Sequence, residues 1–156
     1  MWYKKKKAKN NRQKLIDKLD TIFSKFIRLR DADDNGICRC ITSGEFAHFK
    51  ECDAGHFMSR NNMATRWDEQ NVNAQPRADN RFKAGRQYEH GLAIDKKFGK
   101  GTSEKLLIKS KSPCKFQDFE LEEMIEKYKQ KVKDLEYKQT KANFGDRAGA
   151  PSGSPF

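Results

Sequence analysis

The sequence has few apolar residues and no long run of them. The hydrophobic class makes up 35% of the 156 residues, and charged residues make up another 35%. No stretch approaches the roughly 18 consecutive apolar residues that a membrane-spanning helix needs, so no membrane partner is expected. No apolar signal core follows the basic N-terminus, so secretion is not expected either.

Cysteine is also scarce. Four Cys at uneven spacing in a chain of this length do not indicate a secreted disulfide scaffold. The length suits one compact domain with appendages, and the low apolar fraction indicates that part of the chain lies outside the core. These absences together favour a cytoplasmic protein.

Positive charge, by contrast, is abundant. Lys and Arg total 33 against 22 Asp and Glu, which gives a formal net charge of +11. Such an excess favours nucleic acid, an anionic membrane surface or an acidic protein as partner. Lys4, Lys5, Lys6 and Lys7 are consecutive, and their mutual repulsion predicts a disordered basic arm at 1–12 that contacts phosphates.

Three further parts of the chain carry distinct patterns. From about residue 13 to 29, apolar residues recur at helical spacing, which predicts a core-packing helix. A second helix is predicted at about 118–139, with an acidic first turn and a heptad-like apolar stripe. We expect this stripe to pack against its own domain, and the helix is also a candidate dimer element. A Gly-, Ser- and Pro-rich tail at 141–156 is expected to be disordered, which leaves one domain at 13–140.

The segment at about 37–97 mixes strand and helix signals, so the fold class is α+β. We predict a strand region around a turn at 46–57, a short strand at 71–75 and a helix at 77–97, although two glycines weaken the helical pattern. Residues 102–113 are predicted to be a connector.

The order of His56, Asn71 and Asn80 is the chemically informative feature. A strand that ends in His, a loop, a short strand and a helix with an amide side chain form the layout of a ββα metal-nuclease finger. A neutral His can take a proton from water, and Asp or Asn oxygens suit Mg²⁺. Nearby cationic side chains are candidates for phosphate binding: Arg60, Arg66, Arg77, Arg81 and Lys83.

Three longer stretches resemble the lambdoid phage NinG (Rap) recombination proteins, a branch of the HNH, or His-Me finger, nucleases. They are Asp53-Ala-Gly-His-Phe-Met-Ser-Arg60, the stretch from Met63 to Gln75, and Asn80-Arg-Phe-Lys-Ala-Gly85. The likeness covers roughly residues 15–138. It implies a small ββα-metal finger flanked by N-terminal and C-terminal helices.

The resemblance also implies an activity and roles for individual residues. It implies a structure-selective endonuclease that nicks branched DNA such as Holliday junctions, with Mg²⁺ or Mn²⁺ and no nucleotide cofactor, in the host cytoplasm. His56 would be the general base, Asn71 would tie down the loop between the strands, and Asn80 would help to hold the metal ion. Asp53 is the nearest acid for the remaining ligand, because Gly55 stands where many HNH enzymes have an acidic residue. Two symmetric nicks need two sites, so a homodimer is expected.

The sequence departs from this family's pattern at a structural zinc site. Two Cys-x-x-Cys knuckles are common in such domains, but here the corresponding stretches read Cys40-Ile-Thr-Ser43 and Pro76-Arg-Ala-Asp79. A four-Cys zinc at that place is therefore excluded. The favoured alternative is ordinary packing around Trp67, Phe82 and Tyr88, with His90 at the surface. The weaker alternative is a zinc site made of Cys38, Cys40, His48 and Cys52.

Two other functions compete with the nuclease. A degenerate finger would give a protein that binds branched DNA without cutting it, and the missing knuckle Cys residues favour this reading. An RNA-binding or RNA-cutting protein is the third hypothesis, because charge alone does not distinguish RNA from DNA.

Overall fold

The computed structural model describes residues 10–78 and 86–145, with side chains described as far as residue 142. Within these ranges the chain forms four α-helices, one short 3₁₀ helix and two small antiparallel sheets, so the α+β prediction is confirmed. No helix in the described ranges combines the length and apolar character needed to cross a membrane.

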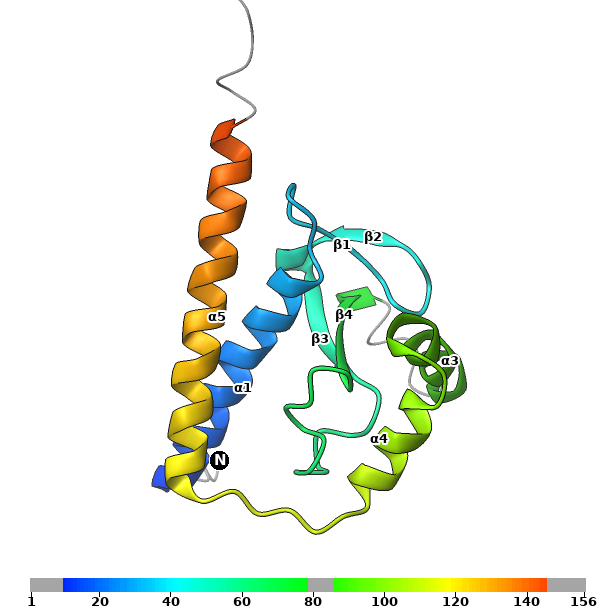
Figure 1. Cartoon of the computed structure of the whole chain (residues 1–156), viewed down its shortest axis with the longest axis vertical. Coiled ribbons are helices and arrows are strands. Elements are labelled where there is room, and N and C mark those ends of the chain that lie inside the picture. Colours follow the sequence, from blue (N-terminus) through cyan, green and yellow to red (C-terminus); the bar gives the residue numbers. More distant parts are fainter. Residues whose placement is uncertain (1–9, 79–85, 146–156) are drawn as a thin grey trace, which may run out of the picture.

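The main core lies between the first and last helices. Helix α1 (Asn11–Arg30) begins after Asn10, whose side chain accepts a hydrogen bond from Gln13 N at 2.8 Å. Helix α5 (Asp118–Gly145) runs beside α1 in the same direction (Figure 1). Arg12 pairs with Asp118 near the start of both helices, and Lys25 pairs with Glu136 farther along.

The heptad-like stripe of α5 packs inside its own domain, as predicted. Leu121, Ile125, Tyr128 and Val132 are buried and share a cluster with the apolar face of α1. The Tyr128 ring packs edge-on against Phe23, with ring centroids 4.8 Å apart. This stripe is therefore covered by α1 and does not offer a free apolar face to a second copy.

Both helices are longer than the sequence pattern indicated. Helix α1 begins at residue 11, inside the predicted arm at 1–12, and α5 continues to residue 145, inside the predicted tail at 141–156. The apolar repeat marks only the packed part of each helix, because exposed terminal turns carry no periodic signal.

Two hairpin-like pairs follow α1. Strand β1 (Ile37–Arg39) pairs with β2 (Phe46–His48), and β3 (Cys52–His56) pairs with β4 (Val72–Pro76). The strand region around a turn predicted at 46–57 corresponds to β2 and β3, and the 3₁₀ helix η1 (Phe49–Glu51) is the turn between them. The predicted strand at 71–75 corresponds to β4, shifted by one residue. Val72 and Ala54 pack toward the α1 core, which places the β3–β4 pair against α1 (Figure 1).

Two helices form the other side of the fold. Helix α3 (Gln87–Phe98) occupies the second half of the helix predicted at 77–97, and residues 79–85 lie outside the described residues. Helix α4 (Thr102–Ser110) replaces the connector predicted at 102–113. The Asp95 carboxylate accepts a hydrogen bond from Ser103 N at 2.7 Å, which satisfies a free amide in the first turn of α4.

Candidate active site

His56 is the last residue of β3 and lines a cleft of about 440 Å³ between that strand and α1. The residues that line the cleft come from α1, β3 and the loop after β3: Asp20, Phe23, Ser24, Asp53, Ala54, His56 and Arg60. The cleft therefore brings together three of the residues singled out in the sequence, namely His56, Asp53 and Arg60. It adds an acid from α1 that the sequence pattern did not single out.

The His56 imidazole is fixed by the loop that follows it. Its Nε2 lies 2.9 Å from the carbonyl oxygen of Arg66. A carbonyl oxygen only accepts, so Nε2 carries the hydrogen and the neutral ring keeps its lone pair on Nδ1. Burial lowers the pKa of His56 below its usual value, and the Arg66 carbonyl opposes this shift only in part. His56 is therefore a neutral proton acceptor near pH 7.

Asn71 joins the two ends of the loop between β3 and β4. Its side-chain oxygen accepts a hydrogen bond from Met58 N at 2.7 Å, and its amide donates to Met58 O at 3.0 Å and to Thr65 O at 2.9 Å. The Asn71 side chain is fully buried, so water cannot take over these hydrogen bonds if the side chain is removed. These three hydrogen bonds form a clamp on the loop. Because Arg66 directly follows Thr65, the clamp also fixes the carbonyl oxygen of Arg66 that contacts His56 Nε2.

Asp20 is the additional acid, and it anchors the same loop to α1. Its carboxylate accepts hydrogen bonds from Arg60 at 2.7 Å, from Arg66 Nε at 3.0 Å and from Trp67 Nε1 at 2.9 Å. Burial raises the pKa of Asp20, but the hydrogen bond and charge of Arg66, with Arg60 and Trp67, lower it more, so Asp20 stays ionised. In the sequence Asp20 is one polar residue within an amphipathic helix, and no local signal marks it.

The predicted DNA-contacting residues lie in different surroundings. Arg66 is only 15% exposed and is held by Asp20, which gives it an internal role. Arg60 and Arg77 are more than half exposed, and Arg77 lies 3.4 Å from Asp53 and donates to the Lys50 carbonyl. The remaining predicted contacts lie outside the described residues: Lys4, Lys5, Lys6, Lys7, Arg81 and Lys83. Asn80, the predicted metal ligand, lies outside them too.

Gly55 directly precedes His56, and its surroundings leave no room for a larger side chain at this position. A Cβ at position 55 would lie 2.0 Å from the side-chain oxygen of Gln75, so the Gln75 carboxamide fills this space. Gln75 is opposite Asp53 in the strand pair, and both side chains lie on the face shared with Gly55. Of these two, only Asp53 also lines the His56 cleft, and its carboxylate oxygens are donors that Mg²⁺ accepts, so the chemistry of Asp53 fits such an ion.

Two of the buried cysteines each lie close to a polar group. Cys38 Sγ lies 3.3 Å from the Arg28 carbonyl, and Cys40 Sγ lies 3.3 Å from the Thr42 hydroxyl. Burial raises the pKa of Cys38 to about 12, and burial also raises the pKa of Cys52, so both thiols are protonated at neutral pH. Among residues 10–78 and 86–145, no three His, Cys, Asp or Glu side chains are grouped as a metal site.

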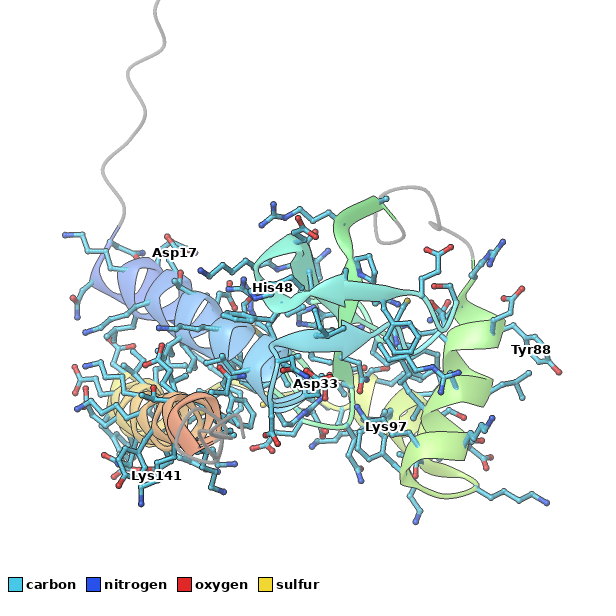
Figure 2. All side chains as sticks on the ribbon, turned by 90° about the horizontal axis from the view of Figure 1, so that it is seen from above. Asp17, Asp33, His48, Tyr88, Lys97 and Lys141 are labelled. Atoms are coloured by element: carbon cyan, nitrogen blue, oxygen red, sulfur yellow. The ribbon has the colours of Figure 1, made fainter. Side chains whose placement is uncertain are left out.

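The packing around the β3–β4 pair and α3 differs in part from the prediction. Trp67 is buried, as predicted, and contacts Phe116. Tyr88 does not fill the core: it is 76% exposed and points away from α3 (Figure 2). His90 is not at the surface but is 7% exposed, with its ring against Phe57. The helix period alone did not show which face of α3 is covered, and Phe82 lies outside the described residues.

His90 makes the stability sensitive to acid. Burial, and secondarily the charge of His56, lower the pKa of His90 to about 4, and its Nε2 has no hydrogen-bond partner among the described residues. The unfolded chain binds this proton at an ordinary pKa of about 6.5, so stability is lost as the pH falls from about 6.5 to about 4. His90→Phe should therefore raise the free energy of unfolding by about 2 kcal/mol at pH 5 relative to its effect at pH 7.5.

Urea unfolding at the two pH values measures this difference. Tyr88→Phe is the matched control, because it introduces the same ring on the exposed face of the same helix and should leave the pH dependence unchanged. An equal pH dependence in His90→Phe and the wild-type chain would contradict the prediction.

Comparison with protein-family models gives a match that covers most of the chain. A family model described as "Bacteriophage Lambda NinG protein" matches residues 1–138, which is most of the chain. Comparison with curated proteins and with solved structures gave no match.

Proposed function

The chain belongs to the bacteriophage lambda NinG family, and from this premise we propose that it is a structure-selective endonuclease that nicks branched DNA. Family membership points to a recombination-related function in phage. The proposed substrate is a four-way junction or a similar recombination intermediate, and the proposed reaction is metal-assisted hydrolysis of a phosphodiester.

The observation that carries the proposal is the state of His56. A neutral imidazole, whose Nε2 is held by the Arg66 carbonyl, lines a cleft beside a carboxylate and a half-exposed Arg. Phosphodiester hydrolysis needs a base for the attacking water and positive charge at the phosphate. His56 would take the proton at Nδ1, and Arg60 would contact a phosphate oxygen.

The other residues of the site would support these two. Asn71 and Asp20 would keep the loop and the His56 ring in place as positioning residues. Asp53 and Asn80 would hold a divalent cation, which when bound supplies positive charge at the scissile phosphate. Two symmetric nicks across a junction need two such sites, so we propose a homodimer on the DNA.

Cleavage of a synthetic four-way junction tests the proposal. We expect nicks in the junction with Mg²⁺ or Mn²⁺, none in EDTA, and much slower cutting of a linear duplex with the same arm sequences. Denaturing gels with each strand labelled in turn give the cut positions. Absence of nicking with either cation, while the junction is bound, would contradict the enzyme assignment.

The second candidate function is a protein that binds branched DNA without cutting it. It is favoured by Gly55, since the space for an acidic ligand before His56 is filled by the Gln75 side chain. This candidate predicts salt-sensitive junction binding, because phosphate contacts release counterions, with no cleavage under any metal condition.

A further inference from the structure

A second cleft, separate from the His56 cleft, lies at the other edge of the β3–β4 pair. It encloses about 700 Å³ between the end of α1, the turn from β1 to β2, and the second half of α3. Its polar lining includes Arg30, Arg39, Thr42, Ser43, Lys96 and Lys97. None of its lining residues also lines the His56 cleft. The end of α1 reaches the β4 edge through Asp31, whose carboxylate accepts from Ala74 N at 2.8 Å.

This cleft is strongly positive. Four cationic side chains line it, and Asp31 is the one carboxylate in its lining. Asp31 is largely buried beside Arg30 and Lys97, at 2.9 and 3.0 Å, and Lys97 extends to it from α3. Burial raises the pKa of Asp31, but these two cations and the Ala74 amide lower it more, so the acid stays charged and fixes both cations. One carboxylate cannot neutralise four cations, so Arg39 and Lys96 add positive charge to the cleft.

Arg39 and Lys96 are the two cations of this cleft that do not pair with Asp31. Neither forms an ion pair with any residue that the structure describes, and both are exposed to solvent. Lys96 lies next to Lys97 in α3, and Arg39 is at the end of β1, so the two approach the cleft from opposite walls. Cations on both sides of a hydroxyl-lined cleft are suited to the phosphates of a nucleic-acid strand.

An exposed aromatic ring adjoins the cations. Phe46 is opposite Arg39 in the β1–β2 pair, is 71% exposed, and has the Arg39 guanidinium 5.8 Å from its ring centroid. An exposed ring beside an Arg is a surface on which an unpaired base can stack. Unpaired or unstacked bases occur at branch points and not within a continuous duplex, so the ring favours DNA near a branch over an acidic protein.

We propose that the cleft lined by Arg39, Lys96 and Lys97 binds the sugar–phosphate backbone of a second DNA arm, with Phe46 stacked on a base at the branch point. This inference rests on the proposed function, because the His56 cleft would act on the first arm. Two clefts at opposite edges of one strand pair allow the chain to distinguish a branched DNA from a linear one before any bond is cut.

Binding of DNA in EDTA tests the inference without cleavage. The probes are a fluorescent four-way junction and a linear duplex of the same arm sequence. The cleft variant is Arg39→Glu with Lys96→Glu, and the matched control is Lys133→Glu with Lys138→Glu, two exposed lysines of α5 with the same change of net charge. Circular dichroism confirms that each variant is folded.

We expect the cleft variant to weaken junction binding more than about tenfold beyond the control and to reduce its salt slope by about 2, the value for two lost phosphate contacts. Phe46→Ala should weaken junction binding at least about fivefold and leave duplex binding unchanged. Equal losses in the cleft variant and the control would overturn the inference, because affinity would then report net charge alone. A wild-type chain that binds junction and duplex equally would overturn both this inference and the proposed function, whereas an intact junction preference in the cleft variant overturns only the inference.

Discussion

His56→Ala is expected to lower the rate of junction nicking by about 10²–10⁴-fold, the usual contribution of a general base. The ring is held by the Arg66 carbonyl and is kept neutral by burial, so its removal leaves the cleft without a proton acceptor at that place. Single-turnover cleavage with Mg²⁺ measures the change in the chemical step, and junction binding in EDTA should change little.

A matched control separates this effect from damage to the loop. Asn61→Ala changes an exposed side chain five residues after His56 and should leave the nicking rate within about twofold, because surface changes away from a site are usually small. Equal nicking rates for His56→Ala and the wild-type chain would exclude His56 as the base.

Asn71→Ala is expected to lower the free energy of unfolding by about 2–5 kcal/mol. The substitution leaves the amide of Met58 and the carbonyls of Met58 and Thr65 buried without their partner. Asn71→Asp should be at least as harmful, because it loses both donated hydrogen bonds and places a charge at a fully buried position. Urea unfolding at pH 7.5 measures both.

The neighbouring exposed residue provides the comparison for Asn71. Gln70→Ala should change the free energy of unfolding by less than about 0.5 kcal/mol. If Asn71→Ala were as stable as Gln70→Ala, the loop would be held by other contacts, and the clamp assigned to Asn71 would be wrong.

The two long helices were predictable because their apolar residues recur over several turns. The helix α4 was not, because only Leu106 and Thr102 among its residues are buried, and its start depends on the Asp95 carboxylate of the preceding helix. The pairing of the strands could not be predicted from the apolar pattern either. The stretch at 46–57 predicted strands around a turn, but it did not show that β2 pairs with β1 and that β3 pairs with β4.

Some residues of the candidate site could likewise be predicted from the sequence, and others could not. His56 and Asp53 are neighbours in one strand, so the sequence alone placed them together. Asp20 is 46 residues from Arg66 and contacts it only because α1 packs against the β3–β4 pair and its connecting loop. The burial of Arg66 likewise follows from that packing, so a basic residue that looked available for phosphate is bound internally.

The parallel pairing of α1 and α5 has a consequence for synthesis on the ribosome. Arg12 and Asp118 form an ion pair across 106 positions of sequence, and the apolar face of α1 is covered chiefly by α5. The β3–β4 pair is therefore synthesised before α5, the helix that completes the main core. Helix α5 must emerge before the largest core can close, so the nascent chain carries an uncovered α1 stripe until the residues from Asp118 onward have been made, and in that state it is exposed to chaperones and proteases.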